Sequence, residues 1–307
     1  MSGEPLRSRS VGLGPAFDLL ANYEPGGFFF ERRGLGLSGM GVASAPGAGG
    51  AGVALGDAAA VAAKMFREIT FETPGAPPPV AMGAFPFAGG SGSLVIPSRS
   101  VVRTTPGETL QVDAWREGSG PAARHRERWV GRAVPHEAFA EMQLRPDPEP
   151  DAYATAVAEA TRRIRGGELR KIVLARSLIV DAERELDPKQ LLWRLRAVDP
   201  DCFAFAVPTA AGRTLVGATP ELLVAKRGRE VTAVPLAGSS PRFGDPKEDR
   251  ASADRLFASA KEREEHAVVV EAVSQTLSLF CEDLRHPREP ELLGTANVWH
   301  LSTPFRG

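Results

Sequence analysis

The chain has 307 residues, of which 43% are hydrophobic, enough to bury a sizeable core in one large domain or two ordinary ones. Lys and Arg number 37 and Asp and Glu 38, so no charge excess draws the chain to nucleic acid or to an anionic membrane. The two cysteines, Cys202 and Cys281, form neither a CxxC nor a metal-type spacing, which argues against a disulfide framework or a zinc site.

No run approaches the ~18 apolar residues of a membrane-spanning helix, and the first residues lack the apolar segment of a signal peptide. We therefore expect a cytoplasmic protein without a membrane partner.

The first half of the chain predicts strands, loops and one helix. An aromatic run leads into the glycine-rich stretch 34–41, Asp57 marks the start of a helix, and strands are predicted over 80–87 and 92–105. Residues 34–39 match GxGxxG, but no helix opens on the third glycine, so a dinucleotide site is rejected. We interpret these glycines as relieving a tight turn or bulge between strands.

The second half predicts more regular elements. The proline-rich stretch 144–151 indicates a loop between two structural halves, 1–145 and 146–307, of a single domain. A helix is expected from Asp151 to Gly166, because an acidic cap and a glycine pair bound an apolar helical pattern. The remaining elements predicted are a strand over 169–180, a helix over 187–198, strands over 202–208, 212–218, 221–227 and 230–237, and one long helix over 249–284. Consecutive strands followed by helices favour an α+β fold with largely antiparallel sheets.

Two ionisable residues are predicted at strand ends beside apolar neighbours. Lys171 shares a strand face with Val173 and Ala175, and burial there would lower the lysine pKa toward that of a working base. Spacing alone favours the alternative, a lysine whose ammonium reaches solvent. Glu221 follows Pro220 and precedes an apolar run, where burial would raise the carboxyl pKa, although the pattern equally allows an exposed edge-strand glutamate.

Glu262 and Glu265 lie three residues apart on a predicted helix and therefore on one face. Paired carboxylates on a rigid helix suit a hard cation such as Mg²⁺, whereas an ordinary solvated charged face is the alternative. His266 has no second histidine four residues on, so zinc is not indicated.

Taken together, these stretches resemble the chorismate-utilising enzymes, most closely the isochorismate synthases of the siderophore-pathway type. The matching residues stand in family order between Asn22 and Thr303 and read YEPGGFFFE, LRKIVLARSL, LVGATPELLV, VPLAGSSPR, KEREEHAVVVEAV and VWHLST. The resemblance covers essentially the whole chain. It implies a chorismate-binding α+β fold, with antiparallel β-sheets packed face to face beneath outer helices.

The resemblance also implies roles for individual residues. Lys171 would be the general base that activates water to attack C2 of chorismate, and Glu221 the general acid that protonates the departing C4 hydroxyl. Glu265 would be a direct Mg²⁺ ligand and Glu262 a supporting one. The implied cofactor is therefore Mg²⁺, which would hold a substrate carboxylate.

Further residues would contact the substrate. By resemblance, Gly238 and Ser239 would hydrogen-bond to it, and His300 would line the ring pocket. Aminodeoxychorismate synthases carry a nucleophilic lysine where this chain has Ala237, so water is the expected nucleophile. No glutaminase partner is expected.

The implied activity is that of an isomerase, isochorismate synthase, serving siderophore (2,3-dihydroxybenzoate or salicylate) or menaquinone biosynthesis. The Leu and Ser of the PLAGS motif favour this activity, because salicylate and anthranilate synthases more often have PIAGT at these positions. The alternatives are a salicylate synthase, which would also eliminate pyruvate, and a catalytically silent, truncated chorismate-binding protein.

Family members continue past the WHLST motif with a glycine-rich segment and an acidic helix that supplies further Mg²⁺ ligands and a substrate-binding arginine. The present sequence stops at Gly307, so the fold is expected to be C-terminally incomplete. The resemblance then implies weak Mg²⁺ binding and little activity for these residues alone.

Overall fold

The computed structural model describes residues 5–14, 17–46, 52–72, 77–121, 142–209 and 212–307. Contacts divide the chain into two compact units. The first consists of Met1–Val134 and Asp187–Glu221, and the second of Pro135–Leu186 and Leu222–Gly307. None of the helices in the described ranges is long and apolar enough to cross a membrane.

In the described part of the first unit, eight strands form one sheet in the order β13-β12-β2-β3-β8-β9-β1-β5. Neighbouring strands pair antiparallel except β1 and β5, which are parallel. The strands are β1 (Leu6–Gly12), β2 (Phe28–Arg32), β3 (Leu35–Met40), β5 (Ile69–Phe71), β8 (Arg99–Thr105), β9 (Glu108–Arg116), β12 (Phe203–Pro208) and β13 (Thr214–Thr219). Sequence-distant segments therefore meet in this sheet, with Phe205 opposite Phe30.

Two apolar clusters hold the first unit together. Helix α3 contributes Leu192 to one cluster, and helix α1 contributes Met65 to the other. The elements outside the large sheet are α1 (Ala58–Arg67), α3 (Pro188–Val198), the short helical turns Leu20–Asn22 and Leu55–Asp57, and a small sheet of β4 (Val53–Ala54), β7 (Ser91–Val95) and β6 (Met82–Ala84). Helix α3 begins as predicted, because the Asp187 carboxylate accepts from the Lys189 N–H at 2.8 Å.

The glycines of the rejected nucleotide motif lie in the β2–β3 hairpin, which confirms the turn interpretation. Arg33 and Gly34 both have positive φ angles, 52° and 75°, in the connection between the strands. Gly36 passes so close to β2 that an added Cβ would lie 2.0 Å from the Phe30 carbonyl oxygen. Only glycine fits this approach.

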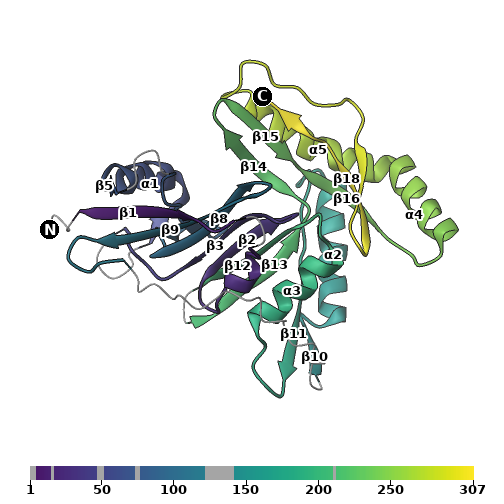
Figure 1. The fold of residues 1–307 in the computed structure, drawn as a ribbon. Helices are drawn as coiled ribbons and strands as arrows, with labels where there is room; N and C mark the ends of the chain where they lie inside the picture. The colour runs from purple at the N-terminus through teal and green to yellow at the C-terminus, as the bar shows by residue number, and fades with distance from the viewer. Residues whose placement is uncertain (1–4, 15–16, 47–51, 73–76, 122–141, 210–211) are drawn as a thin grey trace. The chain divides into compact units, whose positions relative to one another are not determined.

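The second unit combines three helices with three small antiparallel sheets in its described part. Its helices are α2 (Pro150–Arg165), α4 (Pro246–Ala258) and α5 (Ala260–Leu277). The sheets are β10 (Met142–Asp147) with β11 (Ser177–Ala182); β14 (Leu222–Arg227), β15 (Glu230–Val234) and β19 (Phe305–Arg306); and β16 (Leu236–Pro241), β18 (Val298–Ser302) and β17 (Glu291–Gly294). Figure 1 shows α5 beside β16 and β18, against which it packs. The predicted α+β class with mainly antiparallel sheets is confirmed.

The prediction of one long helix over 249–284 was wrong. The chain forms two helices that break at Ser259, whose backbone angles of −69° and 113° are extended. Its hydroxyl accepts from the Glu262 N–H at 3.3 Å and so caps the second helix. Serine competes for backbone hydrogen bonds and favours a cap over a helix interior, which explains the break.

Two further predictions need correction. The predicted strand over 169–180 is a strand only from Ser177, and Val173 is 79% exposed. In the described residues, segment 171–176 has no strand beside it, and the β ladder needs a partner that a local pattern cannot supply. The predicted loop at 144–151 instead ends β10 and begins α2. Pro146 is tolerated in β10 because this strand lies at a sheet edge.

Asp249 joins three elements of the second unit. Its carboxylate accepts from Arg242 Nη2 at 2.9 Å, from the Phe243 N–H at 3.1 Å and from Trp299 Nε1 at 2.9 Å. The Arg242 guanidinium also lies 4.4 Å from the centre of the Trp299 ring. Asp249 thereby ties helix α4 to the end of β16 and to β18.

We expect this cluster to give acid-dependent stability. Arg242, followed by the Phe243 and Trp299 donors, outweighs burial and lowers the Asp249 pKa from 3.8 to about 2. A lowered folded-state pKa contributes stability that is complete above the ordinary value and is lost as pH falls toward 2. Urea unfolding should therefore show that the free energy of unfolding falls between pH 5 and pH 2, and Asp249→Asn should lack this part of the decrease. Asp254→Asn, which removes an exposed α4 carboxylate, should keep the wild-type profile.

Candidate active site

The second unit brings seven of the eight predicted site residues into one contiguous set of contacts. They come from segment 170–174, from β16, from the start of α5 and from β18. The seven residues are Lys171, Ala237, Gly238, Ser239, Glu262, Glu265 and His300. The eighth, Glu221, belongs to the first unit.

Lys171 is ion-paired with Glu265, with 3.2 Å between Nζ and Oε1. The side chains are 21% and 38% exposed, so the pair lies at the wall of a groove and not in bulk solvent. The groove, about 540 Å³ in volume, runs between α2, segment 170–174 and α5, and Tyr153, Ile172 and Val268 supply apolar lining. The predicted general base and the predicted metal ligand are therefore direct neighbours.

Strand β16 touches helix α5 at Gly238. The register between β16 and β18 shifts between Leu236 and Ser239, so Ala237 and Gly238 form a bulge. Gly238 has a φ of +82°, and an added Cβ would lie 3.3 Å from both the Cβ and the carbonyl oxygen of Glu262. A side chain here would meet both backbone strain and the helix, so the bulge requires glycine.

Beyond the bulge, Ser239 and His300 face each other across β16 and β18. The Ser239 hydroxyl lies 2.9 Å from His300 Nδ1, and the two residues are partners in the strand register. Both side chains carry groups that can donate to or accept from a polar ligand. The pair thus places two adjustable hydrogen-bonding groups beside the bulge.

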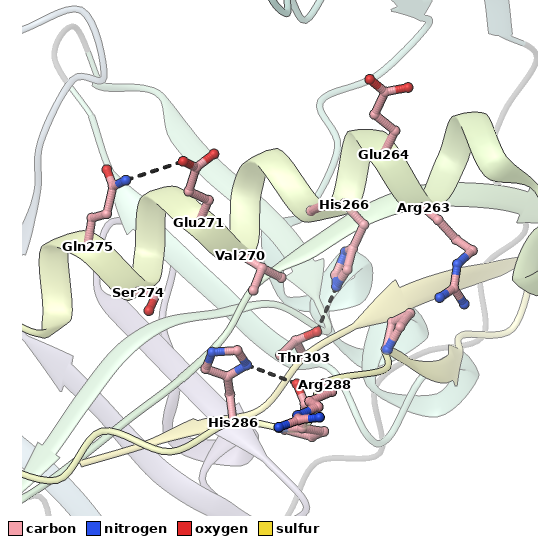
Figure 2. Close-up of a pocket in the computed structure, with 13 residues that line it drawn as sticks. Arg263, Glu264, His266, Val270, Glu271, Ser274, Gln275, His286, Arg288 and Thr303 are labelled. Atoms are coloured by element: carbon pink, nitrogen blue, oxygen red, sulfur yellow. Dashed lines mark hydrogen bonds between the residues drawn. The ribbon is translucent and has the colours of Figure 1, made fainter.

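His266 was not identified as a site residue from the sequence. Its side chain, 3% exposed, points from α5 toward Thr303, which follows β18 (Figure 2). Nδ1 lies 3.1 Å from the Ala237 carbonyl oxygen and Nε2 lies 2.7 Å from the Thr303 hydroxyl. Burial lowers the His266 pKa against the opposing effect of the Ala237 carbonyl, and the nearby Lys171 charge lowers it further. The ring is therefore neutral at neutral pH.

A second hollow of about 500 Å³ lies on α5 beside His266 (Figure 2). Polar groups from the helix and from segment 286–290 line it, among them Arg263, Gln275, His286 and Arg288. Arg263 is ion-paired with Glu289. None of the eight predicted site residues lines this hollow, which shares Glu264, Ala267 and Glu271 of α5 with the groove at Lys171.

The donor set at the start of α5 fits a hard cation. Glu262 and Glu265 supply carboxylate oxygens, and each is bonded to a lysine, Lys261 at 3.0 Å and Lys171 at 3.2 Å. Across the described residues, no three His, Cys, Asp or Glu side chains converge as a metal cluster. Two carboxylates suit Mg²⁺, which keeps several water ligands.

Glu221 follows β13, and its N–H donates to the Thr219 hydroxyl at 3.2 Å. The prediction that it begins a strand was wrong by one residue, since β14 starts at Leu222. The expected burial is also not found, because Glu221 is exposed and Leu223 is 86% exposed. An apolar run in sequence does not bury its neighbours unless another element covers it.

Comparison with known families identifies the class of protein to which this fold belongs. Residues 90–307 match the family model described as "Chorismate binding enzyme", and the chain belongs to this family.

Named relatives are similar over part of their length. Isochorismate synthase DhbC from Bacillus subtilis is 42% identical over 170 residues, which are 53% of this chain and 43% of DhbC. Isochorismate synthase EntC from Escherichia coli is 39% identical over 160 residues, which are 52% of this chain and 41% of EntC. The chain thus spans less than half the length of these two relatives.

Solved structures support the fold over nearly the whole chain. The crystal structure of DhbC from Bacillus anthracis has a TM-score of 0.74 at 29% identity, covering 94% of this chain and 69% of that one. MenF, the menaquinone-specific isochorismate synthase from Escherichia coli, has a TM-score of 0.76, covering 99% and 71%. At 20% identity, MenF shows likeness of fold alone.

The contacts of His266 predict its tautomer. The Ala237 carbonyl can only accept, so Nδ1 must carry the proton and Nε2 must accept from the Thr303 hydroxyl. Long-range ¹⁵N spectra at neutral pH should show His266 protonated at Nδ1. A ring protonated at Nε2 alone would contradict the hydrogen-bond scheme.

Proposed function

We propose that the chain carries the catalytic part of an isochorismate synthase, which converts chorismate to isochorismate for siderophore or menaquinone biosynthesis. The observation that carries the proposal is the joining of Lys171, Glu265 and the β16 bulge in one unit, with Ala237 where a covalent mechanism would need a lysine. The names of DhbC and EntC support it. In this proposal, residues 1–307 belong to a single chorismate-binding domain.

Lys171 acts as the general base toward water. Its Nζ lies 3.2 Å from Glu265 Oε1, so this ion pair must loosen before Nζ can turn to a water molecule. The groove then orients the amine and the water against C2 of the substrate. The Lys171–Glu265 contact thus controls when the base is available.

Glu221 acts as the general acid, which requires a protonated carboxyl at the departing C4 hydroxyl. Its exposed position leaves the carboxyl accessible to a ligand. The acid and the base come from different parts of the sequence.

The bulge recognises the substrate. The Gly238 backbone and the Ser239 hydroxyl donate hydrogen bonds, and His300, held through Nδ1, lines the ring pocket. Glu265 and Glu262 would hold Mg²⁺, which when bound supplies positive charge for a substrate carboxylate. No glutaminase partner is needed, because the nucleophile is water and not ammonia.

The product distinguishes this proposal from its alternatives. The purified chain with chorismate and Mg²⁺ should form isochorismate without pyruvate, salicylate or anthranilate, analysed by chromatography with mass detection. Added ammonium should not change the product. Salicylate with pyruvate would instead identify a salicylate synthase, and chorismate binding by calorimetry without turnover would identify a silent binding protein. A chain that neither binds nor converts chorismate would contradict the proposal.

Substitution tests the acid and base. Lys171→Ala and Glu221→Gln should each lower kcat by ~10²-fold or more, the loss expected for general acid or base catalysis, with unchanged thermal unfolding. Lys226→Ala and Glu230→Gln are matched controls from the exposed β14–β15 hairpin and should keep wild-type kcat. A near-native rate in either site variant would remove that residue from the mechanism.

A further inference from the structure

We propose that His266 is a positioning residue that sets helix α5 against the β16 bulge and β18, and so fixes the two candidate metal carboxylates relative to the substrate strand. The inference rests on the proposed function and assigns His266 and Thr303 a part in it.

The first observation is that His266 bonds to two elements outside its own helix. Nδ1 reaches the Ala237 carbonyl of β16 at 3.1 Å, and Nε2 reaches the Thr303 hydroxyl at 2.7 Å. The Thr303 N–H in turn donates to the carbonyl of Pro235, the residue before β16, at 3.4 Å. A single imidazole therefore connects α5 with the β16 bulge and with the chain leaving β18, and Figure 2 shows the second of these contacts.

The second observation is where these bonds fall in the sequence. His266 directly follows Glu265, and Ala237 directly precedes Gly238. A bulge leaves one residue without a regular ladder partner, and the Ala237 carbonyl obtains its donor from the imidazole instead. The histidine thus fixes two features together: the backbone at the bulge, and the helix turn that carries the Glu262 and Glu265 carboxylates.

The third observation is that the arrangement tolerates little displacement. Glu262 lies one turn before His266. Its Cβ and its carbonyl oxygen would each lie 3.3 Å from a Cβ added to Gly238. His266 itself is 3% exposed and Thr303 is 2% exposed. A shift of α5 large enough to lose either hydrogen bond would leave a buried polar group unpaired, which costs about 1–3 kcal/mol.

The direction of the hydrogen bond between Thr303 and His266 allows a specific test. Because Nδ1 donates to a carbonyl, the Thr303 hydroxyl must donate to Nε2. Thr303→Val removes this donor at nearly constant volume and leaves Nε2 unpaired, whereas Thr303→Ser retains it. Leu256→Ala, which truncates a buried leucine of α4, is the control for general loss of stability.

Two readouts follow the helix position without depending on turnover. The first is Mn²⁺ binding to the purified chain, followed by electron paramagnetic resonance. Thr303→Val should weaken it about tenfold, while Thr303→Ser stays within about twofold of wild type. The second is amide hydrogen exchange, which in Thr303→Val should accelerate together over 237–240 and 260–266. Leu256→Ala should lower the melting temperature but leave both the Mn²⁺ affinity and the amide exchange over 237–240 and 260–266 unchanged.

Two outcomes would overturn the positioning role. One is a Thr303→Val chain with a lower melting temperature but wild-type Mn²⁺ affinity and exchange. The other is an equal loss in the valine and serine variants, because the hydroxyl would then not matter. If the wild type binds no Mn²⁺, the metal part of the proposed function fails, and coupled exchange at 237–240 and 260–266 decides the positioning role alone.

Discussion

The close approach of helix α5 to strand β16 at Gly238 is the contact on which the candidate site depends. The backbone there takes a positive φ angle, and an added Cβ would lie only 3.3 Å from Glu262. The chain breaks at Ser259, where extended backbone angles end α4 before α5 begins. Lys171 then bonds to Glu265 of α5 from outside the helix, and His266, on the next residue of α5, bonds outward to the Ala237 carbonyl and the Thr303 hydroxyl.

Local chemistry made several elements predictable. Helix α3 begins at an aspartate cap followed by proline, and helix α2 ends at Gly166, so the signals lie within a few residues of the boundaries they set. The hairpin at Arg33 and Gly34 is equally local. At the site, the i, i+3 spacing of Glu262 and Glu265 depends only on helix geometry, although their metal role came from resemblance.

The remaining features depend on distant partners. Segment 171–176 has the composition of a strand, but a strand forms only beside another strand, and the described residues supply none there. The burial expected at Glu221 fails for a similar reason, since no described element covers Leu223. His266 was not predicted as a site residue because a lone histidine on a charged helix has no distinctive spacing. Its importance comes from Ala237 and Thr303, which lie 29 and 37 residues away in sequence.

The hydrogen bond from His266 to the Ala237 carbonyl also bears on how this family can diversify. It anchors the main chain at residue 237 from outside the strand, so the backbone course there does not depend on which side chain residue 237 carries. Gly238 also makes the backbone course independent of the side chain at 237, because the positive φ angle that the bulge needs is adopted by Gly238 itself. Replacing the Ala237 side chain would therefore leave both backbone constraints in place, so a single substitution can introduce a nucleophile there without removing them.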